Sequence, residues 1–483
     1  MAGKPSEKLF RRENYLNVQI TYMKIVGMFP IDYAKFLPQR LAFLSSVLNR
    51  MYFAFWQLIS MHIAIVQIAS VYVYWGESLD ELSPYLNNSV IYLFTYFIIT
   101  YFQFKYNSHA KLIAYINENF EMRSAQGLTY VTIEPAYKAA KRFTNIWVIS
   151  CIFGTLHWAF SPILTGVRAL PLQSWYPFDA LKSPQYEILY ACQCLGQINV
   201  AIGFGIVGAM LMSKITLVNV QYDMLFCSIK NLLYTAMILK GNRMKELKKL
   251  QDAIDWSKSE VNEYYVSKDI LENLSDIPET KCSQVPHSKR KPEDTYLMEY
   301  NDELMMALRD CIKHHQMINI FCNKLEDFYN AFNFGKFFQV TILICLLAVT
   351  ATTGQNSLMK MITITEYLSL ASSELLIFCH YASMITYQST RLNEAIIRSP
   401  WYMCGGPVRR DMLIMLTNTV KPFVLTGGKF FQVTIDNFPN KITVIVELHD
   451  IKKTNELKLY RSLETEKKRK TLTYLKVSII LIL

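Results

Sequence analysis

One stretch of the sequence matches the pattern of a nucleotide-binding site. Residues 203–208 read Gly-Phe-Gly-Ile-Val-Gly, and Asp223 follows at the distance of a ribose-binding acid. The pattern binds phosphate only where it follows a strand, and this copy lies inside an apolar segment of helix length. Ala201, Gly205 and Ala209 recur every four residues, which predicts close contact between membrane helices. We therefore expect no nucleotide cofactor.

The histidines and cysteines do not suggest a metal centre either. His314 and His315 are adjacent, so on a helix their side chains diverge, and we expect them to be packed or hydrogen-bonded. The ten cysteines show no recurring spacing and no CxxC pair, which favours free thiols over disulfides or zinc. The sequence also has no HExxH motif, nucleophile elbow or P-loop. We expect no catalytic residue, metal or cofactor, and the chain is not expected to be an enzyme.

The composition favours a membrane protein. Of the 483 residues 52% are hydrophobic and 18% are charged, and the mean hydropathy is +0.14. A soluble chain of this length normally divides into two or three domains and carries more charge. The net charge of +11 could indicate a nucleic-acid partner, but the basic residues alternate with apolar segments instead of forming one patch. We expect no nucleic-acid partner, and no cleaved signal peptide within residues 1–50.

Six apolar segments could each cross the bilayer as a helix. A hydrocarbon core of about 30 Å needs about 20 helical residues, and segments of this length are too long for strands. The six segments are residues 51–74, 86–104, 144–164, 188–212, 334–353 and 361–383. Lys336 lies near the end of its segment, where its amine is expected to reach water. Glu366 and Glu374 are intramembrane acids, for which an ion pathway and a structural hydrogen bond both stay open.

The distribution of Lys and Arg sets the orientation of these segments. The N-terminal segment and the second and fourth connections are rich in basic residues, whereas the first connection, residues 76–85, has none. Basic loops stay in the cytoplasm, so the N-terminus is expected there. This is the reverse of G-protein-coupled receptors, whose Asp-Arg-Tyr and Asn-Pro-x-x-Tyr motifs are also missing. Asn87 begins a sequon at the predicted outer face and is a candidate glycosylation site.

The chain divides into six parts on this pattern. Residues 218–239 and 302–332 show helical apolar spacing within the long cytosolic connection, and the charged segment between them, with three prolines before residue 300, is expected to be a mobile insert. The predicted parts are a cytosolic N-terminal segment (1–50), spans one to four (51–212), the cytosolic connection (213–333), spans five and six (334–386), a cytosolic helix leading into a seventh span (387–438), and a C-terminal tail (439–483).

Several segments resemble the insect odorant receptor family. Residues 170–179 read LPLQSWYPFD, which is similar to the family's Trp-Tyr-Pro-Phe-Asp outer loop, and residues 308–316 resemble the helix before its fifth span. The strongest resemblance lies in residues 374–379, 387–389, 399–402, 409–410 and 421–431, and a weaker one in residues 25–30. It covers residues 17–438 apart from the insert. The sequences of residues 399–402 and 422–429 resemble those of ligand-tuning subunits more than that of the shared co-receptor.

The resemblance implies an all-α, seven-helix polytopic membrane protein with an intracellular N-terminus, the orientation that the charges predict independently. It implies an odour-gated cation channel in the plasma membrane, a hetero-tetramer with the co-receptor, and a last helix that lines the pore. It also implies a cavity for small volatile organic molecules in the outer halves of spans two, three, four and six. The candidate cavity residues are Ile91, Phe94, Phe153, Gly154, His157, Trp158, Gln197, Ala201, Tyr367 and Leu370.

Two alternatives to an odorant receptor stay open. A gustatory receptor of the same superfamily would carry a different signature in its last helix. A secondary transporter would often show internal repeats, and no repeat relates the two halves of this chain. Neither alternative changes the expected helical membrane fold.

The sequence departs from the family after Phe438. Pro439 and the largely apolar residues 442–446 are followed by Glu447, Asp450 and the lysines at 452 and 453. Four charged residues in one span would cost on the order of 10 kcal/mol, which so short an apolar run does not offset. Residues 439–483 are therefore expected not to form the normal pore helix. We favour an altered transcript or gene model over a subunit that conducts poorly.

Overall fold

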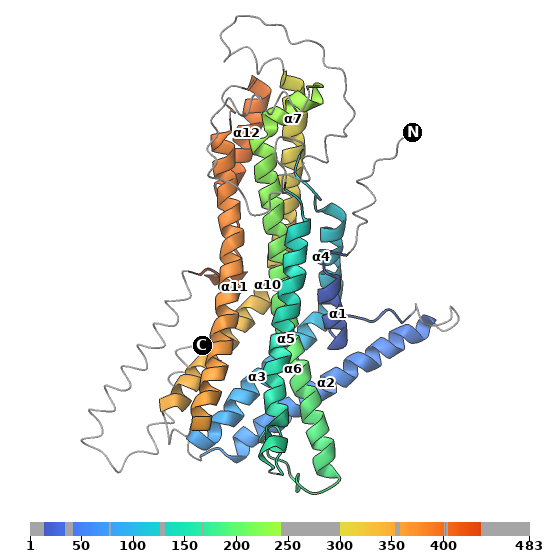
Figure 1. Cartoon of the computed structure of the whole chain (residues 1–483), viewed down its shortest axis with the longest axis vertical. Coiled ribbons are helices and arrows are strands. Elements are labelled where there is room, and N and C mark those ends of the chain that lie inside the picture. The colour runs from blue at the N-terminus through green and yellow to red at the C-terminus, as the bar shows by residue number, and fades with distance from the viewer. Residues whose placement is uncertain are drawn as a thin grey trace, which may run out of the picture.

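The computed structural model is a long bundle of helices (Figure 1). It describes residues 14–33, 42–76, 79–125, 131–166, 168–242, 300–352, 358–399, 401 and 404–435. Most of the predicted insert, the start of the seventh span from residue 436 and the predicted tail 439–483 lie outside these residues. The helices are α1 (Asn17–Ile25), α2 (Ala42–Val73), α3 (Leu79–Phe104), α4 (Tyr106–Asn119), α5 (Glu134–Thr165), α6 (Gln185–Lys230), α7 (Leu232–Leu239), α10 (Asn301–Thr352), α11 (Leu358–Arg398) and α12 (Gly406–Thr419).

The predicted spans each fall within one helix, in the order α2, α3, α5, α6, α10 and α11. Four of these helices, α2, α6, α10 and α11, are long and apolar enough to cross a membrane. The loop between α5 and α6 lies at the lower end of Figure 1, and α7 and α12 lie at the upper end. On the predicted topology the lower end is the outer side and the upper end is the cytoplasmic side.

Two helices continue far beyond the predicted membrane boundary. The 46 residues of α6 extend about 69 Å, more than twice the thickness of a hydrocarbon core of about 30 Å. The 52 residues of α10 are longer still. Residues 218–239 and 302–332 are helical, as their spacing predicts, but they belong largely to helices that continue from the predicted spans. Most of the first continues α6, with a break at Asn231 before α7, and the second is the first part of α10.

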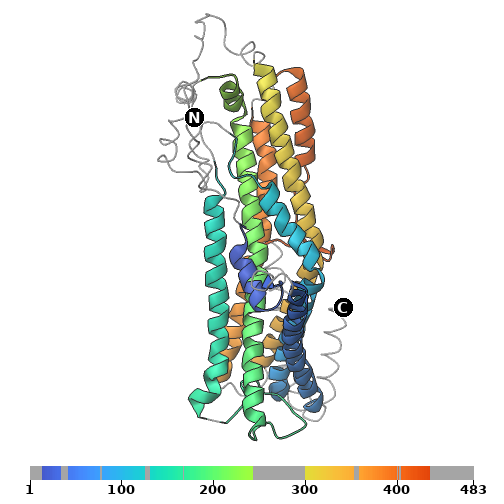
Figure 2. The same ribbon diagram turned by 90° about the vertical axis from the view of Figure 1, so that its right-hand side faces the viewer.

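Small residues and short polar contacts hold the bundle together beside α6. An added Cβ on Gly205 would lie 3.3 Å from Cys151 Sγ and 3.4 Å from Val148 Cα, so α5 approaches α6 closely there, as the spacing of small residues predicts. The Gln19 amide of α1 donates to Thr144 Oγ1 at 2.9 Å and to Ser213 Oγ at 2.8 Å. These contacts attach the N-terminal helix to α5 and α6 (Figure 2).

The last described residues form a small hairpin against α10. Its strands are β1 (Thr426–Gly427) and β2 (Phe431–Gln432), paired antiparallel. Thr426 N donates to Glu326 Oε2 at 3.0 Å, and Asn333 Nδ2 donates to Thr426 O at 3.0 Å. The chain that leads toward the predicted seventh span is thus fixed to α10.

Candidate functional site

A cavity of about 110 Å³ lies in the outer half of the bundle. Residues of four helices, α3, α5, α6 and α11, line it together with Leu172 of the outer loop, and it is partly open. Its walls are mainly apolar. The lining residues are Asn88, Ile91, Tyr92, Ser150, Cys151, Gly154, Thr155, Leu172, Gln197, Val200 and Tyr367.

The structure brings four of the predicted cavity residues together here. Ile91, Gly154, Gln197 and Tyr367 line the same space, and they come from the four spans that the family resemblance pointed to. This arrangement depends on residues up to 276 positions apart in the sequence (91 to 367). It is a property of the packed bundle and of no single helix.

Other predicted residues lie elsewhere. Phe153 does not line the cavity and is 78% exposed on the outside of α5, since it precedes Gly154 by one residue and one residue turns a helix by about 100°. Phe94 and Ala201 are buried in helix contacts and do not line the cavity either. The side chains of three further candidates, His157, Trp158 and Leu370, lie outside the described set.

The predicted sequon is packed inside the bundle. The Asn87 side chain on α3 is 7% exposed. Its amide is therefore not accessible to modification in this conformation.

Most of the lining residues that the sequence reasoning missed are helical neighbours of residues that it found. Asn88 precedes Ile91 by three positions, Cys151 precedes Gly154 by three, and Val200 follows Gln197 by three. Residues at this spacing share one face of a helix. Extending each predicted face by one turn would therefore have found them, whereas no periodicity predicts a loop residue such as Leu172.

Two of the hydroxyl groups around the cavity, those of Ser150 and Thr155, bond to their own helix. Ser150 Oγ donates to the carbonyl of Ile146 at 2.8 Å, and Thr155 Oγ1 donates to that of Ile152 at 2.8 Å. The amide of Gln197 differs, because neither its nitrogen nor its oxygen has a hydrogen-bond partner among the described residues. Gln197 is thus a fully buried polar group in the wall whose hydrogen-bonding capacity is unused by the described residues.

A second, smaller space lies on the cytoplasmic side of the first. Its volume of about 10 Å³ is close to that of one water molecule. Tyr367 and Glu374, seven residues apart on α11, line the outer and the inner space respectively. Val200 and Val207 repeat this relation on α6. Seven residues span about 10 Å of helix, so the two spaces lie about two turns apart.

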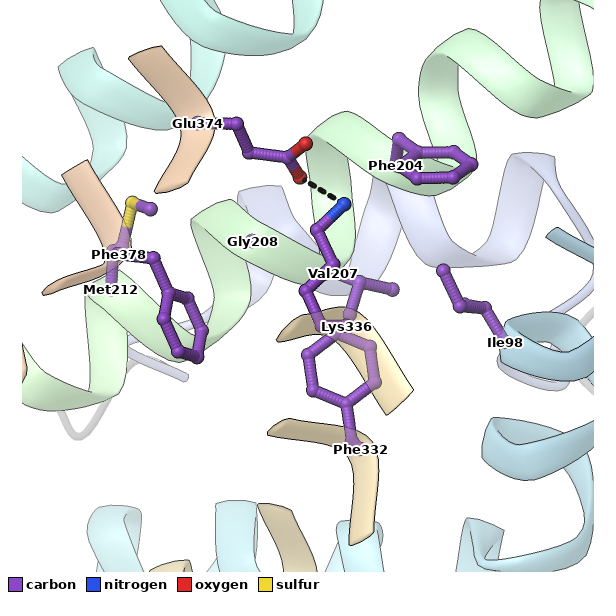
Figure 3. Close-up of a pocket in the computed structure, with 9 residues that line it drawn as sticks. All are labelled: Ile98, Phe204, Val207, Gly208, Met212, Phe332, Lys336, Glu374 and Phe378. Atoms are coloured by element: carbon purple, nitrogen blue, oxygen red, sulfur yellow. Dashed lines mark ion pairs between the residues drawn. The ribbon is translucent and has the colours of Figure 1, made fainter. Parts of the chain in front are cut away.

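An ion pair occupies the wall of the smaller space. Lys336 Nζ of α10 lies 2.8 Å from Glu374 Oε1 of α11, and Figure 3 shows the two side chains pointing toward one another. The same ammonium group lies 4.3 Å from the centroid of the Phe204 ring and 5.6 Å from that of Phe94. Lys336 is only 5% exposed. The prediction that it extends to water is therefore wrong, because an acid on the neighbouring helix satisfies its charge inside the bundle.

The residues that resembled nucleotide and metal sites have structural roles. Residues 203–208 lie within the unbroken helix α6, with no strand before them. His314 bonds to Gln221 Oε1 at 2.9 Å, and His315 bonds to Asn319 Nδ2 at 3.1 Å, so the two rings have separate partners. Burial lowers the pKa of His314 to about 4. Among the described residues no group of three or more His, Cys, Asp or Glu side chains could hold a metal ion.

The chain is similar to odorant receptors of insects. It is 33% identical to odorant receptor 83a of Drosophila melanogaster over 90% of this chain and 93% of that one. It is 29% identical to putative odorant receptor 85e of the same species over 85% of each chain. It is also 22% identical to the odorant receptor coreceptor of Anopheles gambiae, over 58% of this chain and 62% of that one.

A solved structure has the same fold. The insect olfactory receptor OR5 from Machilis hrabei, solved in complex with eugenol, superposes with a TM-score of 0.62 at 14% identity, covering 91% of this chain and 99% of that one. The sequence model of the 7tm Odorant receptor family matches residues 81–442. The family is one of multi-pass membrane receptors, which agrees with the expectation that the chain is not an enzyme. With a match across most of its length, the chain belongs to the 7tm odorant receptor family.

Proposed function

We propose that this chain is the ligand-tuning subunit of an odour-gated cation channel, and that a small volatile organic molecule binds in the 110 Å³ cavity. The observation that carries the proposal is the cavity itself. It is concave, mainly apolar, and built from the outer halves of four spans, as a site for such a ligand should be. The eugenol complex of the similarly folded Machilis receptor supports a ligand of this size and character.

The proposed partner is an odorant receptor co-receptor in a hetero-tetramer, placed in the plasma membrane with the N-terminus in the cytoplasm. The alternation of basic connections supports this orientation. A tag at Met1 should be detected only after the cells are permeabilised. Labelling of that tag on intact cells would contradict the proposed topology.

The test of function is to co-express the full chain with an insect co-receptor and record currents against an odorant panel. We expect ligand-dependent cation currents that require both proteins. Currents from this chain alone would indicate a stand-alone channel, and saturable uptake of a substrate without current would indicate a transporter. Either result would overturn the proposed role.

A matched pair of variants tests the location of the ligand. Val200→Phe enlarges a side chain in the cavity wall and should raise the half-maximal concentration for most ligands. Phe153→Ala changes an exposed side chain on α5 and should leave the dose–response curves unchanged at equal surface expression. Equal effects of the two variants would place the ligand elsewhere.

A further inference from the structure

The residues that line the cavity favour one chemical class of ligand. We propose that Gln197 is the polar anchor of the cavity, and that the ligands are small neutral molecules with an apolar body and one oxygen function, such as an alcohol, ketone or ester. This inference rests on the proposed function and goes further, because it names the ligand class and the residue that selects it.

The first observation is the state of the Gln197 amide. The residue is 4% exposed, and its Nε2 and Oε1 atoms are both buried without a partner among the described residues. A buried amide without hydrogen bonds is unfavourable, so native proteins pair nearly all such groups. Asn219 on the same helix is also unpaired, but it lines neither cavity. Among the described residues that line the cavity, Gln197 is the one whose amide is both fully buried and unpaired.

The neighbouring amides of α6 each have at least one protein partner. Gln193 Oε1 accepts from Leu172 N at 2.9 Å, and its Nε2 donates to Ser174 Oγ at 3.3 Å. Asn199 Nδ2 donates to Ser60 Oγ at 2.8 Å. The protein therefore bonds both groups of the Gln193 amide, one turn before Gln197, and the nitrogen of Asn199, two residues after it. Among the described residues it bonds neither group of Gln197, so the cavity is the place from which a partner can come.

The remaining walls limit the chemistry of the ligand. None of the lining residues carries a charge at neutral pH, and the hydroxyl groups of Ser150 and Thr155 bond to their own helix. An anionic or cationic ligand would be desolvated without a counter-ion, since Lys336 and Glu374 lie about two turns away and pair with each other. A neutral oxygen suits the site, because a carbonyl accepts from Nε2 and an alcohol can also donate to Oε1.

The size of the space limits the ligand as well. Its volume of about 110 Å³ is somewhat smaller than an apolar cavity of about 150 Å³ that binds benzene. A single ring or a short chain with one oxygen function therefore fits. Such a molecule fills the apolar part of the cavity and replaces any water on Gln197 with its own oxygen, whereas a hydrocarbon leaves the amide unpaired.

The experiment compares matched pairs of ligands on the full chain with its co-receptor. The pairs are cyclohexanone with methylcyclohexane, and 2-heptanone with octane. In the wild type each oxygenated compound should be about tenfold or more as potent as its hydrocarbon partner, because the hydrocarbon leaves a buried amide unsatisfied. Gln197→Met keeps the side-chain length and removes the amide, so it should reduce this preference to about twofold or less.

Two further variants separate selection from folding. Gln197→Asn keeps an amide and should retain a larger preference for oxygenated ligands than Gln197→Met does. Asn199→Leu removes a buried amide that faces α2, and it should change the potency of both members of a pair alike. If Gln197→Met does not reach the cell surface, the role of Gln197 is tested by comparing how strongly the wild type and Gln197→Asn prefer oxygenated ligands over hydrocarbons.

Equal potency within pairs in the wild type would overturn the role of Gln197 while leaving the odour-gated channel intact. An unchanged preference in Gln197→Met would do the same. Potent responses confined to acids or amines would overturn the neutral ligand class. The absence of current for every compound of a broad panel would overturn the proposed function and this inference together.

Discussion

The two halves of α6 treat buried polar side chains differently. In the cytoplasmic half, Lys214 Nζ lies 2.7 Å from His109 Nε2 and donates to Tyr329 Oη at 2.8 Å. Asp223 further along pairs with Arg391 Nη1 at 3.1 Å. In the outer half, Gln197 has no partner among the described residues and borders a cavity. The unpaired amide of Asn219 in the cytoplasmic half borders no such space, so the open part of α6 is its outer half.

The difference follows from what each half can accept. A buried amine or carboxylate is strongly unfavourable without partners, so the contacts of Lys214 and Asp223 fix the positions of α4, α10 and α11 around the cytoplasmic half of α6. A neutral amide such as that of Gln197 costs less free energy to leave unpaired, so it can remain unpaired until a ligand binds. We infer a rigid cytoplasmic base and an outer half whose interactions are completed by the molecule that binds there.

The largest expected effect on stability comes from removing a buried ion pair in the cytoplasmic half of the bundle. Asp223→Ala removes one partner of the buried pair with Arg391, whose guanidinium also lies 4.2 Å from the Phe226 ring centroid. Loss of one partner of a buried ion pair costs about 3–5 kcal/mol, so the variant should lose most of its surface expression and thermal stability. Thermal unfolding of the detergent-solubilised protein measures this.

The control for this variant is Asp310→Ala. Asp310 pairs with Lys313 at the surface, where both side chains are more than 70% exposed, and such pairs contribute little. Its melting temperature should match that of the wild type. Equal melting temperatures for Asp223→Ala and Asp310→Ala would show that the base does not depend on its buried charges.

Low pH should destabilise the cytoplasmic half of the bundle over a defined range of pH. Burial lowers the pKa of His314 from 6.5 to about 4, and that of its neighbour His315 also to about 4. Between these values the unfolded chain binds a proton that the folded chain excludes, so stability falls as the pH falls from 6.5 toward 4. For one histidine the loss at pH 5 is about 2 kcal/mol.

His314→Gln removes one of the two titratable rings and keeps a side chain able to contact Gln221. Its melting temperature should therefore fall less than that of the wild type between pH 7.5 and pH 5. Identical acid sensitivity in the two proteins would mean that His314 titrates normally in the folded state.

Much of this architecture could be predicted from the sequence. Apolar runs of about 20 residues located the six described spans, since hydropathy reports burial in lipid directly. The helical extensions were not predictable, because apolar residues such as Val218 and Leu225 look the same in a separate helix and in a continuation of α6. The partner of Lys336 was not predictable either, since Glu374 lies 38 positions away (336 to 374) on another helix.

The candidate site was predicted in part for a related reason. The family resemblance indicated which spans surround the cavity, but the rotation of each helix decides which residues face it. The sequence ranked Gly154 above Phe153, because Gly154 lies one turn from Trp158, but α5 has no clear apolar stripe that would exclude Phe153. Only the packed bundle shows that Gly154 lines the cavity and Phe153 is exposed.

The contact between α5 and α6 tests where the packed region begins. Gly205→Ala places a Cβ 3.4 Å from the backbone of Val148, and this crowding should offset the usual gain of up to about 1 kcal/mol from replacing a helical glycine. Gly208→Ala meets only Met212 Cε at 4.0 Å and should keep that gain. The two melting temperatures should therefore differ, and equal values would argue against close packing at Gly205.

The smallest expected effect concerns the open half and leaves the packing untouched. An added Cβ on Gly154 would meet no atom of the described residues within 4 Å, so Gly154→Ala extends a methyl group into the cavity without crowding them. Stability should stay the same or rise slightly, because alanine is the better helix former. The methyl group takes the place of about one CH₂ of ligand, worth about 0.8 kcal/mol, or about a fourfold change in potency.

That change should depend on ligand size. Along a series of 2-alkanones, Gly154→Ala should reduce the potency of the longest active members about fourfold and leave the shortest unchanged. Phe153→Ala, the adjacent exposed position, should shift none of them. A uniform shift across the series would indicate an effect on gating instead of on the volume of the cavity. A size-dependent shift with unchanged stability would show that the outer half of the bundle can be altered independently of its cytoplasmic base.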